Sequence, residues 1–283
     1  MIDSEKVSTP GGMLHVRVIG AGPPVLLLHG FPDSSLGFRE LCEALAARGF
    51  RAIAPDLLGY GMSDKPPGLA PYRSEAVVAD LAALARWAGG KVAVLGHDWG
   101  GTHAYCFAAE HPELVTQLVI INAAHPESYA RALRTSLQLV RSWYILFFQL
   151  RKIAEWVVTR RLVFGWLLRR LVSHKEVMTE ARVEAARREL LRPGAVTAAL
   201  SYYRAAFRWP TRCPKPILSP TLVLWGDADP ALDSRLLVGL EQHVSRLRVQ
   251  HIEGAGHFVQ WDEPERVAAE VTAFLRAVPG EPA

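Results

Sequence analysis

The feature of this sequence that most constrains its fold is the alternation of short apolar runs with longer amphipathic segments. Apolar runs rich in β-branched residues begin at Leu14, Pro23, Arg51, Lys91 and Leu118. Between them, segments such as LGFRELCEALAARGF and SEAVVADLAALARWAGG repeat their apolar residues every three to four positions, which is the period of an α-helix. Apolar strands that alternate with helices predict an α/β protein, with a mostly parallel central sheet flanked by helices on both faces.

This alternation stops after Ala124. Residues 125–215 contain no strand-like run and are helical, aromatic and basic in character. The strand pattern then resumes in PTLVLWG and LRVQHI, and PERVAAEVTAFLRAV has the period of a closing helix. We therefore predict one core domain built from residues 1–124 and 216–283, with a helical cap at 125–215 inserted between two strands of its sheet.

Composition and charge exclude several classes of protein. Half of the 283 residues are apolar and 21% are charged, so the chain can bury a sizeable core and lacks the signature of a disordered protein. The net charge is +4, and no dense Lys/Arg tract interleaved with aromatic residues points to nucleic acid. The cysteines, Cys42, Cys106 and Cys213, have no metal-ligand spacing. With neither a secretory signal nor an apolar run of about 18 residues, we expect a cytoplasmic protein that binds no metal.

Polar and glycine-rich segments follow most of the predicted strands. They are HGFPD (29–33), GYGMSD (59–64), GHDWGG (96–101), NAAHP (122–126), GDAD (226–229) and GAGH (254–257). In open parallel sheets, ligands bind beyond the carboxyl ends of the strands. We therefore expect the functional site to be built from these segments.

The segment GHDWG combines two glycines with an acid, Asp98, between a predicted strand and a predicted helix. A Gly-x-nucleophile-x-Gly turn in that position holds its central side chain above the sheet at a helix N-terminus. Asp is also a preferred N-cap residue, but a cap alone would leave the flanking glycines unexplained. We predict that Asp98 is a nucleophile.

The motifs HGFPD, GYGMSD and GHDWGG resemble those of the α/β-hydrolase superfamily, and specifically its epoxide hydrolases, in which the nucleophile turn carries Asp instead of Ser. The resemblance extends in order and spacing over about residues 14–275. It implies the α/β-hydrolase fold, with a helical cap over the site.

The chemistry of a carboxylate explains the acid at this turn. A carboxylate can attack a saturated carbon and form an alkyl ester, which water can then hydrolyse at the carbonyl. A serine at the same place would form a stable ether. An Asp nucleophile therefore indicates covalent catalysis in two steps, and we predict a cofactor-independent epoxide hydrolase that converts a small lipophilic epoxide and water into a vicinal diol.

The second step needs a base that activates water. His257, in GAGH, falls in the chain order nucleophile, acid, histidine expected of this fold. An acid must orient its imidazole, and the segment GDAD offers both Asp227 and Asp229. The family pattern favours Asp229.

An oxyanion that forms on the nucleophile carboxyl during ester hydrolysis needs N–H donors. One is expected from the backbone of Trp99, the residue after the nucleophile, and the resemblance assigns the other to Phe31. Pro32 is compatible with a cis peptide bond in that loop. His29 and His97 are expected to orient these loops.

The leaving alkoxide of an opened epoxide needs a weak acid. A phenol, with a pKa near 10, stays protonated at physiological pH. Two segments of the insertion, SWYILFFQ and ALSYYRAAF, resemble the cap motifs of epoxide hydrolases. The match assigns this role to Tyr144 and Tyr203, with Tyr202 as the neighbour most easily confused with the second.

This sequence departs from the epoxide hydrolase pattern at two places in or near the cap. Ala124 stands where the family usually has a proline, which we expect to loosen the loop that leads into the cap. Residues 151–175 place Arg and Lys between large apolar residues. Such a segment can be a basic amphipathic surface that touches anionic membrane, or cap helices whose apolar faces pack on the core with arginines in solvent. We expect the second arrangement.

Other functions remain open from the sequence. A haloalkane dehalogenase shares the Asp nucleophile, the histidine and a tryptophan after the nucleophile, here Trp99, which donates to the halide. It also needs a second halide donor, for which the loop offers only Phe31 and the cap offers Trp143 and Trp156. A non-catalytic ligand-binding protein on this fold is disfavoured because every expected catalytic position is present. A serine esterase is disfavoured by Asp98 itself. The sequence leaves the substrate and the oligomeric state open, and a homodimer is compatible with it.

Overall fold

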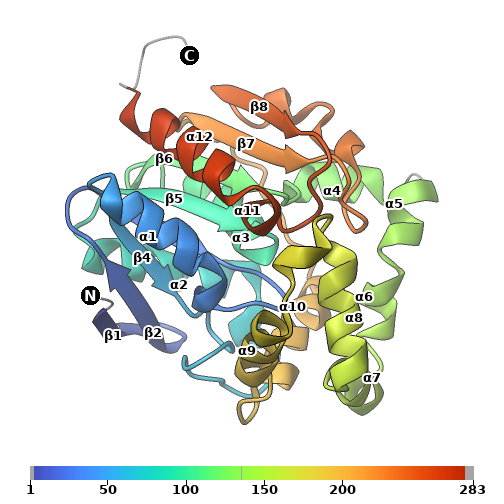
Figure 1. The fold of residues 1–283 in the computed structure, drawn as a ribbon. Helices are drawn as coiled ribbons and strands as arrows, with labels where there is room; N and C mark the ends of the chain where they lie inside the picture. Colours follow the sequence, from blue (N-terminus) through green and yellow to red (C-terminus); the bar gives the residue numbers. More distant parts are fainter. Residues whose placement is uncertain (1–2, 135, 278–283) are drawn as a thin grey trace.

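The computed structural model describes residues 3–134 and 136–277, and its strands form one mixed sheet (Figure 1). Within these residues the eight strands follow the order β1-β2-β4-β3-β5-β6-β7-β8. Strands β3 to β8 are parallel to one another, whereas β1 and β2 are antiparallel to their neighbours. The strands are β1 (Asp3–Thr9), β2 (Gly12–Ile19), β3 (Pro24–Leu28), β4 (Arg51–Pro55), β5 (Val92–His97), β6 (Val115–Ile121), β7 (Thr221–Gly226) and β8 (Leu247–Ile252).

The central strands are apolar throughout because both faces of the sheet are covered. Every residue of β5 and β7 is buried. On one face, Val25 and Leu27 of β3 pack with α1 (Arg39–Ala47) and α12 (Pro264–Arg276). On the other face, Leu26 and Leu28 pack with α2 (Ser74–Trp87) and α3 (Trp99–Glu110). The predicted α/β fold with a mostly parallel sheet is confirmed.

Strand β1 was not predicted from the sequence. Its residues, DSEKVST, are mostly exposed, and only Val7 is buried. The strand lies at the edge of the sheet and pairs with β2 through backbone hydrogen bonds, from Asp3 opposite Val18 to Thr9 opposite Gly12. A polar edge strand has no apolar periodicity, so the pattern of its residues carries no signal.

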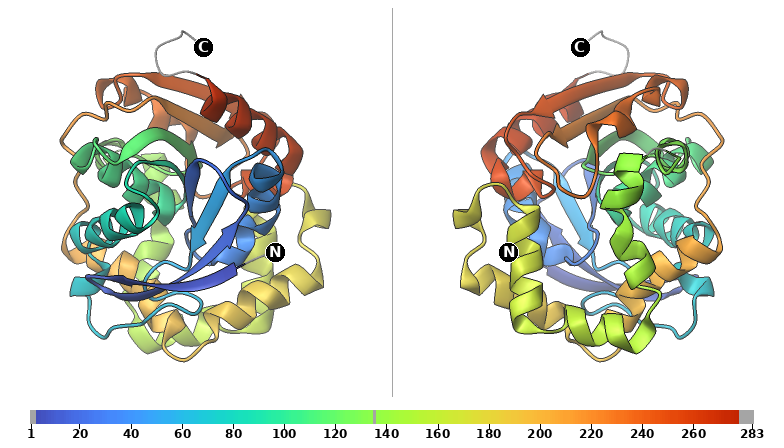
Figure 2. Two further views of the ribbon diagram at one scale, coloured as in Figure 1. Left: turned by 90° about the vertical axis from the view of Figure 1, so that its left-hand side faces the viewer. Right: turned by 90° about the vertical axis from the view of Figure 1, so that its right-hand side faces the viewer.

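The helices between β6 and β7 form a layer of their own beyond the carboxyl ends of the strands (Figure 2). Two side chains, Tyr202 and Arg204, connect this layer to the core and its helices to one another. The Tyr202 hydroxyl donates to the carbonyl of Leu58, at 2.8 Å, and the buried Arg204 guanidinium binds Glu155 at 2.9 Å and the carbonyl of Phe148 at 2.9 Å. These cap helices are α4 (Pro126–Ala132), α5 (Ser136–Arg141), α6 (Trp143–Phe147), α7 (Arg151–Val158), α8 (Arg161–Leu171), α9 (Glu180–Leu190) and α10 (Ala195–Arg208).

Short helical turns complete the connections. They are α11 (Val259–Asp262) and the 3₁₀ turns η1 (Ser35–Phe38), η2 (Ala70–Tyr72), η3 (Lys175–Val177), η4 (Ser234–Leu237) and η5 (Leu240–Gln242).

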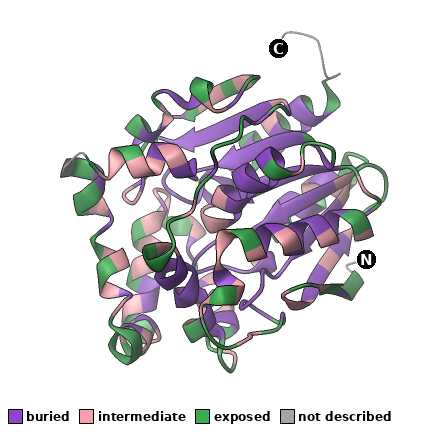
Figure 3. Ribbon diagram, turned by 180° about the vertical axis from the view of Figure 1, so that it is seen from behind, coloured by how far each residue is buried: buried purple, intermediate pink, exposed green. Residues whose placement is uncertain are grey.

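The basic segment 151–175 departs from the expected packing. Ala154, Val158, Phe164 and Leu168 are buried as expected, but several large apolar side chains of α7 and α8 lie in solvent, as the exposed colouring of the cap indicates (Figure 3). Leu162 is 87% exposed. The expectation that the apolar faces of this segment are covered by the core is therefore wrong in part, because α7 and α8 carry apolar residues on more than one face. Over the described ranges, no helix is both long and apolar enough to cross a membrane.

Candidate active site

Asp98 lies at the sharp turn between β5 and α3, in a strained backbone conformation with φ 51° and ψ −123°. Such angles are uncommon for any residue other than glycine. After this turn the chain passes close to β3. The approach requires glycine at position 100, because a Cβ there would collide with the carbonyl of Leu28. The Asp98 side chain makes no capping hydrogen bond to α3, so the helix-cap interpretation does not account for it.

One oxygen of the Asp98 carboxylate is held by backbone donors. The Phe31 N–H donates to Oδ1 at 2.8 Å, and the adjacent Trp99 N–H helps to lower the pKa of the carboxylate. The Phe31–Pro32 peptide bond is cis, as the sequence allowed. A Cβ on Gly30 would overlap the Asp98 carboxylate, so glycine is needed beside it. Both backbone groups expected to form an oxyanion hole are therefore in contact with Asp98.

The other oxygen of Asp98 faces a histidine. His257 Nε2 lies 3.6 Å from Asp98 Oδ2, and His257 Nδ1 lies 2.7 Å from Asp229 Oδ2. Burial disfavours a charge on the imidazole, but the two carboxylates outweigh it and raise the pKa of His257 to about 10. Burial likewise opposes ionisation of Asp98, but the nearby charge of His257 reverses that effect and holds the pKa of Asp98 below its usual value. Asp98 is therefore ionised at neutral pH.

The structure separates the two acids of GDAD. The Asp229 side chain is buried and contacts His257, whereas Asp227 binds His251 on the surface, with Oδ1 and Nδ1 2.6 Å apart. Only Asp229 lies close enough to orient the imidazole.

Asn122 adds a contact that the sequence analysis did not predict, since it noted NAAHP only as one of the segments that follow a strand. Its Nδ2 donates to Asp229 Oδ2 at 2.6 Å, and its Oδ1 accepts from the backbone N–H of Gly226 at 2.7 Å. Its own backbone has φ 35°, which Asn tolerates better than most residues. An amide at the end of β6, next to the strand that carries the acid, was the available signal.

Two buried histidines form hydrogen bonds with the loops that carry the site. His97 Nε2 donates to the backbone carbonyl of His257 at 3.0 Å, and burial lowers the pKa of His97 to about 3. His29 Nε2 accepts from the N–H of Leu57 at 3.0 Å. Both histidines bind backbone atoms of loops at the site, which matches the orienting role expected for them.

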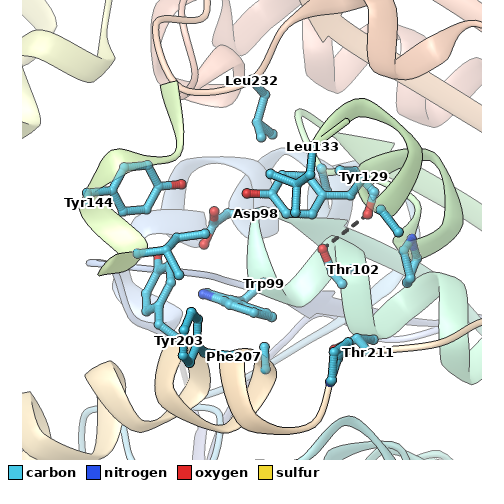
Figure 4. A pocket seen from close by; sticks show the side chains of 17 residues that line it. Asp98, Trp99, Thr102, Tyr129, Leu133, Tyr144, Tyr203, Phe207, Thr211 and Leu232 are labelled. Atoms are coloured by element: carbon cyan, nitrogen blue, oxygen red, sulfur yellow. Dashed lines mark hydrogen bonds between the residues drawn. The ribbon is translucent and has the colours of Figure 1, made fainter. Parts of the chain in front are cut away.

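A cavity of about 280 Å³ opens above Asp98 between the sheet and the cap (Figure 4). Its wall is mostly apolar, with polar side chains at a few points. The lining residues are Asp98, Trp99, Thr102, Ala123, Ala124, Pro126, Tyr129, Ala130, Leu133, Tyr144, Ile145, Tyr203, Ala206, Phe207, Pro210, Thr211 and Leu232.

Both tyrosines assigned from the cap motifs reach this cavity. The rings of Tyr144 and Tyr203 meet edge to face with centroids 5.9 Å apart, and Tyr203 contacts Trp99 with centroids 5.0 Å apart. Burial raises the pKa of each phenol well above 10, so both are neutral donors. The neighbour Tyr202 does not line the cavity, and it packs between Tyr60 and Tyr72.

Trp99 lines the cavity, but the candidates for the second halide donor that a dehalogenase needs do not. The side chains of Trp143 and Trp156 are 62% and 59% exposed and do not line its wall. In the part of the chain that the structure describes, no cluster of His, Cys, Asp or Glu side chains is arranged to hold a metal ion.

Comparison with known proteins identifies the family. A family model described as the alpha/beta hydrolase fold matches residues 23–264. The chain is 33% identical to Epoxide hydrolase 3 of Xenopus tropicalis, over 90% of this chain and 71% of that protein. It is 33% identical to the AB hydrolase superfamily protein YfhM of Bacillus subtilis, over 95% of this chain and 96% of that protein.

Similarity to solved structures supports the same family. The crystal structure of an epoxide hydrolase of Bacillus megaterium with an inhibitor superposes with a TM-score of 0.87, at 28% identity, over 96% of this chain and all of that chain. A variant of the same enzyme, crystallised with a naphthyloxy-propanediol product, superposes with a TM-score of 0.86 at 29% identity, over the same shares of the two chains. The chain therefore belongs to the α/β-hydrolase superfamily, in the group that contains the epoxide hydrolases.

Proposed function

We propose that this protein hydrolyses lipophilic epoxides to vicinal diols through a covalent ester on Asp98. The observation that carries the proposal is the position of Asp98: an ionised carboxylate at a strained turn, with backbone donors on one oxygen, a histidine near the other and two neutral phenols in the cavity above it. The similarity to epoxide hydrolases, one of which was crystallised with a diol product, supports the same reaction.

In the first step, Asp98 Oδ2 attacks a ring carbon, because Oδ1 is engaged by the Phe31 N–H. The C–O bond of the epoxide breaks, and the electron pair goes to the ring oxygen. Tyr144 and Tyr203 donate hydrogen bonds to that oxygen, and a phenol supplies the proton that completes the hydroxyl group. Their raised pKa values keep the phenols protonated until the alkoxide forms.

The ester changes the electrostatics of His257. Before the reaction two carboxylates face its imidazole and raise its pKa. Esterification removes the charge of Asp98, so only Asp229 still favours the protonated form and the pKa of His257 falls. The proton that His257 releases restores the phenol that protonated the ring oxygen. The neutral imidazole then takes a proton from water, which attacks the ester carbonyl. Negative charge develops on Oδ1, where the N–H groups of Phe31 and Trp99 stabilise it. The intermediate collapses when the bond between Cγ and the ester oxygen breaks, and this oxygen takes the proton from the His257 imidazolium, which releases the diol and regenerates the Asp98 carboxylate.

The other candidate functions are less well supported. A dehalogenase would have Trp99 as one halide donor in the cavity but lacks the second, because Phe31 provides no side-chain donor and the indoles of Trp143 and Trp156 lie in solvent. A non-catalytic binding protein would not need His257 placed between the carboxylates of Asp98 and Asp229.

We also propose that residues 125–215 act as a cap domain that closes the cavity over a core of 1–124 and 216–283. A cytoplasmic location is consistent with the free thiols Cys42, Cys106 and Cys213, all of which are buried.

A single-turnover reaction in heavy-oxygen water tests the mechanism. We expect the label to enter the Asp98 carboxylate, because water attacks the ester carbonyl, and mass analysis of the peptide that contains Asp98 will detect it. An unlabelled peptide after turnover would exclude the ester. His257→Gln should trap the ester, whereas Tyr144→Phe combined with Tyr203→Phe should prevent its formation. If the double variant still opened epoxides, the assignment of the phenols would be wrong.

A further inference from the structure

Tyr129 of α4 is a third tyrosine in the wall of the cavity, outside the motifs that identified Tyr144 and Tyr203. Its hydroxyl points across the space above Asp98 toward Tyr144 (Figure 4). Tyr129 is close enough to Asp98 and Tyr144 to interact with them electrostatically. Burial and, to a smaller extent, the charge of Asp98 raise the pKa of Tyr129, and burial and the nearby Tyr129 raise the pKa of Tyr144. The reaction as described above makes no use of this side chain.

A chain of hydrogen bonds fixes the direction in which Tyr129 can donate. The backbone N–H of Asp233 donates to Gln138 Oε1 at 3.1 Å, which orients the buried Gln138 amide. Gln138 Nε2 then donates to Ser142 Oγ at 3.0 Å and to the carbonyl of Ala231 at 3.1 Å, so both its protons are used.

Ser142 therefore accepts from Gln138 and must place its own proton elsewhere. Tyr129 Oη, at 2.6 Å, is the one acceptor available to it among the described residues. Tyr129 consequently accepts from Ser142, and its own O–H proton remains free to donate into the cavity. Each bond in such a chain polarises the next, which makes the terminal donor stronger.

We propose that Tyr129 is a specificity-determining residue, which binds an acceptor oxygen on the substituent of the substrate next to the epoxide ring. The preferred substrates are then epoxides with an ether or similar oxygen on the neighbouring carbon. This inference rests on the proposed epoxide hydrolysis and adds the chemical class of the substrate.

A matched pair of substrates tests the role of Tyr129. Phenyl glycidyl ether and 4-phenyl-1,2-epoxybutane differ by an oxygen in place of a methylene group. We expect Tyr129→Phe to lower kcat/KM for the ether about tenfold, the effect of one lost hydrogen bond, and to change kcat/KM for the carbon analogue by less than about twofold. Ser142→Ala should reduce the preference for the ether in the same direction, because the phenol loses the partner that aligns it.

Thr102→Val is the matched control, since Thr102 also lines the cavity but donates to the carbonyl of Ala124, at 3.2 Å. It should leave the preference unchanged. Equal losses on both substrates in Tyr129→Phe would mean that the phenol serves the epoxide oxygen or the water, and no loss on either would mean that it binds nothing. Either result overturns this inference but not the proposed function, whereas a wild-type protein that hydrolyses neither epoxide overturns both.

A separate observation concerns the cap helices α5 to α8, many of whose large apolar side chains are exposed. Soluble proteins rarely expose a cluster of this kind without a partner for it. We call this cluster the cap patch. Its members are Leu137, Leu139, Val140, Trp143, Leu146, Leu150, Ile153, Trp156, Leu162 and Trp166.

The charge around the cap patch is net positive, although Arg141 is paired with Asp233, and Arg161 and Arg169 are paired with Glu180. Residues 136–170 contain seven Lys and Arg residues and one acid, Glu155. That acid is paired with the buried Arg204, at 2.9 Å. Arg160 lies over the ring of Trp156, 4.0 Å from its centroid. A twofold dimer through this surface would bring like charges together, whereas an anionic surface would be attracted.

We further infer that the cap patch docks on the surface of an anionic lipid bilayer. Trp and Arg are the side chains that favour the interface between lipid headgroups and acyl chains. Trp143 and Leu146 share the short helix α6 with Tyr144, so the docked face lies next to the catalytic cap residues, close to the phase in which lipophilic epoxides dissolve.

Sedimentation with vesicles tests this inference. We expect the protein to pellet with vesicles of phosphatidylcholine and phosphatidylserine, and much less with phosphatidylcholine alone. Trp156→Gln combined with Leu162→Gln and Trp166→Gln should abolish pelleting. Arg160→Gln and Arg170→Gln should each weaken binding about fivefold, from about 1 kcal/mol per basic residue at such a surface.

The matched control replaces three exposed apolar residues outside the patch, Met62, Leu218 and Val238, by Gln, and should pellet as the wild type does. Recovery of the wild type in the supernatant with both kinds of vesicle would overturn the inference. So would a stable dimer in ultracentrifugation that the triple patch variant dissociates, because the patch would then join two copies of this chain.

Discussion

Asn122→Ala should separate the two steps of the reaction. The side chain of Asn122 donates one of four hydrogen bonds to Asp229, with the others coming from the N–H groups of Ala231 and Leu232 and from His257. It touches neither Asp98 nor the cavity wall. Its loss should therefore act only through Asp229 on the base.

The size of the effect follows from these contacts. A hydrogen bond to a charged group contributes about 1.5–3 kcal/mol, and because three donors to Asp229 remain we expect the lower end of that range, a slowing of ester hydrolysis by about tenfold. Ester formation should be nearly unchanged. Rapid-quench mixing followed by mass analysis of the intact protein should show the alkyl-enzyme accumulating in the first turnover.

Gln117→Ala provides the matched control. Gln117 is a buried amide on the same strand, β6, and its Nε2 donates to the carbonyl of Phe274, at 2.7 Å, away from the active site. Both variants should lose stability by about 1–3 kcal/mol, since each removes a buried amide and its hydrogen bonds, but only Asn122→Ala should accumulate the ester. If ester formation and hydrolysis slowed equally, or if Gln117→Ala also accumulated ester, the assignment of Asn122 as a positioning residue would be refuted.

Three further predictions concern the acid, the cap and the core. Asp229→Asn should slow ester hydrolysis by about 10³–10⁴-fold, while Asp227→Asn, on the surface, should leave turnover unchanged; equal losses would mean that the pairing with His257 is unimportant. Arg204→Lys should destabilise the cap by about 3 kcal/mol, because a lysine cannot bind Glu155 and the backbone together, and hydrogen exchange should then rise in α6 and α7 first. Burial raises the pKa of Asp33 to about 7, so between pH 4 and 7 the folded state holds a proton that the unfolded chain has released. The free energy of unfolding should therefore fall as pH rises, by at most about 1.4 kcal/mol per pH unit. Urea unfolding at several pH values should show this slope in the wild type and not in Asp33→Asn.

The elements that could be predicted from the sequence have local signals. Strands β3 to β7 are apolar because both faces of the sheet are covered, and the turn at Asp98 has glycines where the chain passes close to β3. Strand β1 is different, since it exposes its side chains and owes its place to backbone pairing with β2. No periodicity in DSEKVST indicates such pairing.

Contacts that join distant segments could not be predicted in the same way. Asn122 contacts Asp229 across 107 positions of the chain. The chain of hydrogen bonds that ends at Tyr129 begins at Asp233 and passes through Gln138 and Ser142. Each of these residues is ordinary in its own stretch of sequence. Their roles arise only when β6, β7 and the cap helices come together.

The sequence by itself determined the type of chemistry that we propose, because an acid at a strand-to-helix turn followed by a histidine after the last strand allows attack on carbon and then hydrolysis of an ester. It also determined the parallel sheet, since burial on both faces dictates which residues its strands contain. The tertiary structure decided which acid meets His257, which of two adjacent tyrosines enters the cavity and which apolar side chains of the cap remain in solvent. Those outcomes depend on distances between segments far apart in the chain, and the identity of a residue does not encode its distance from another.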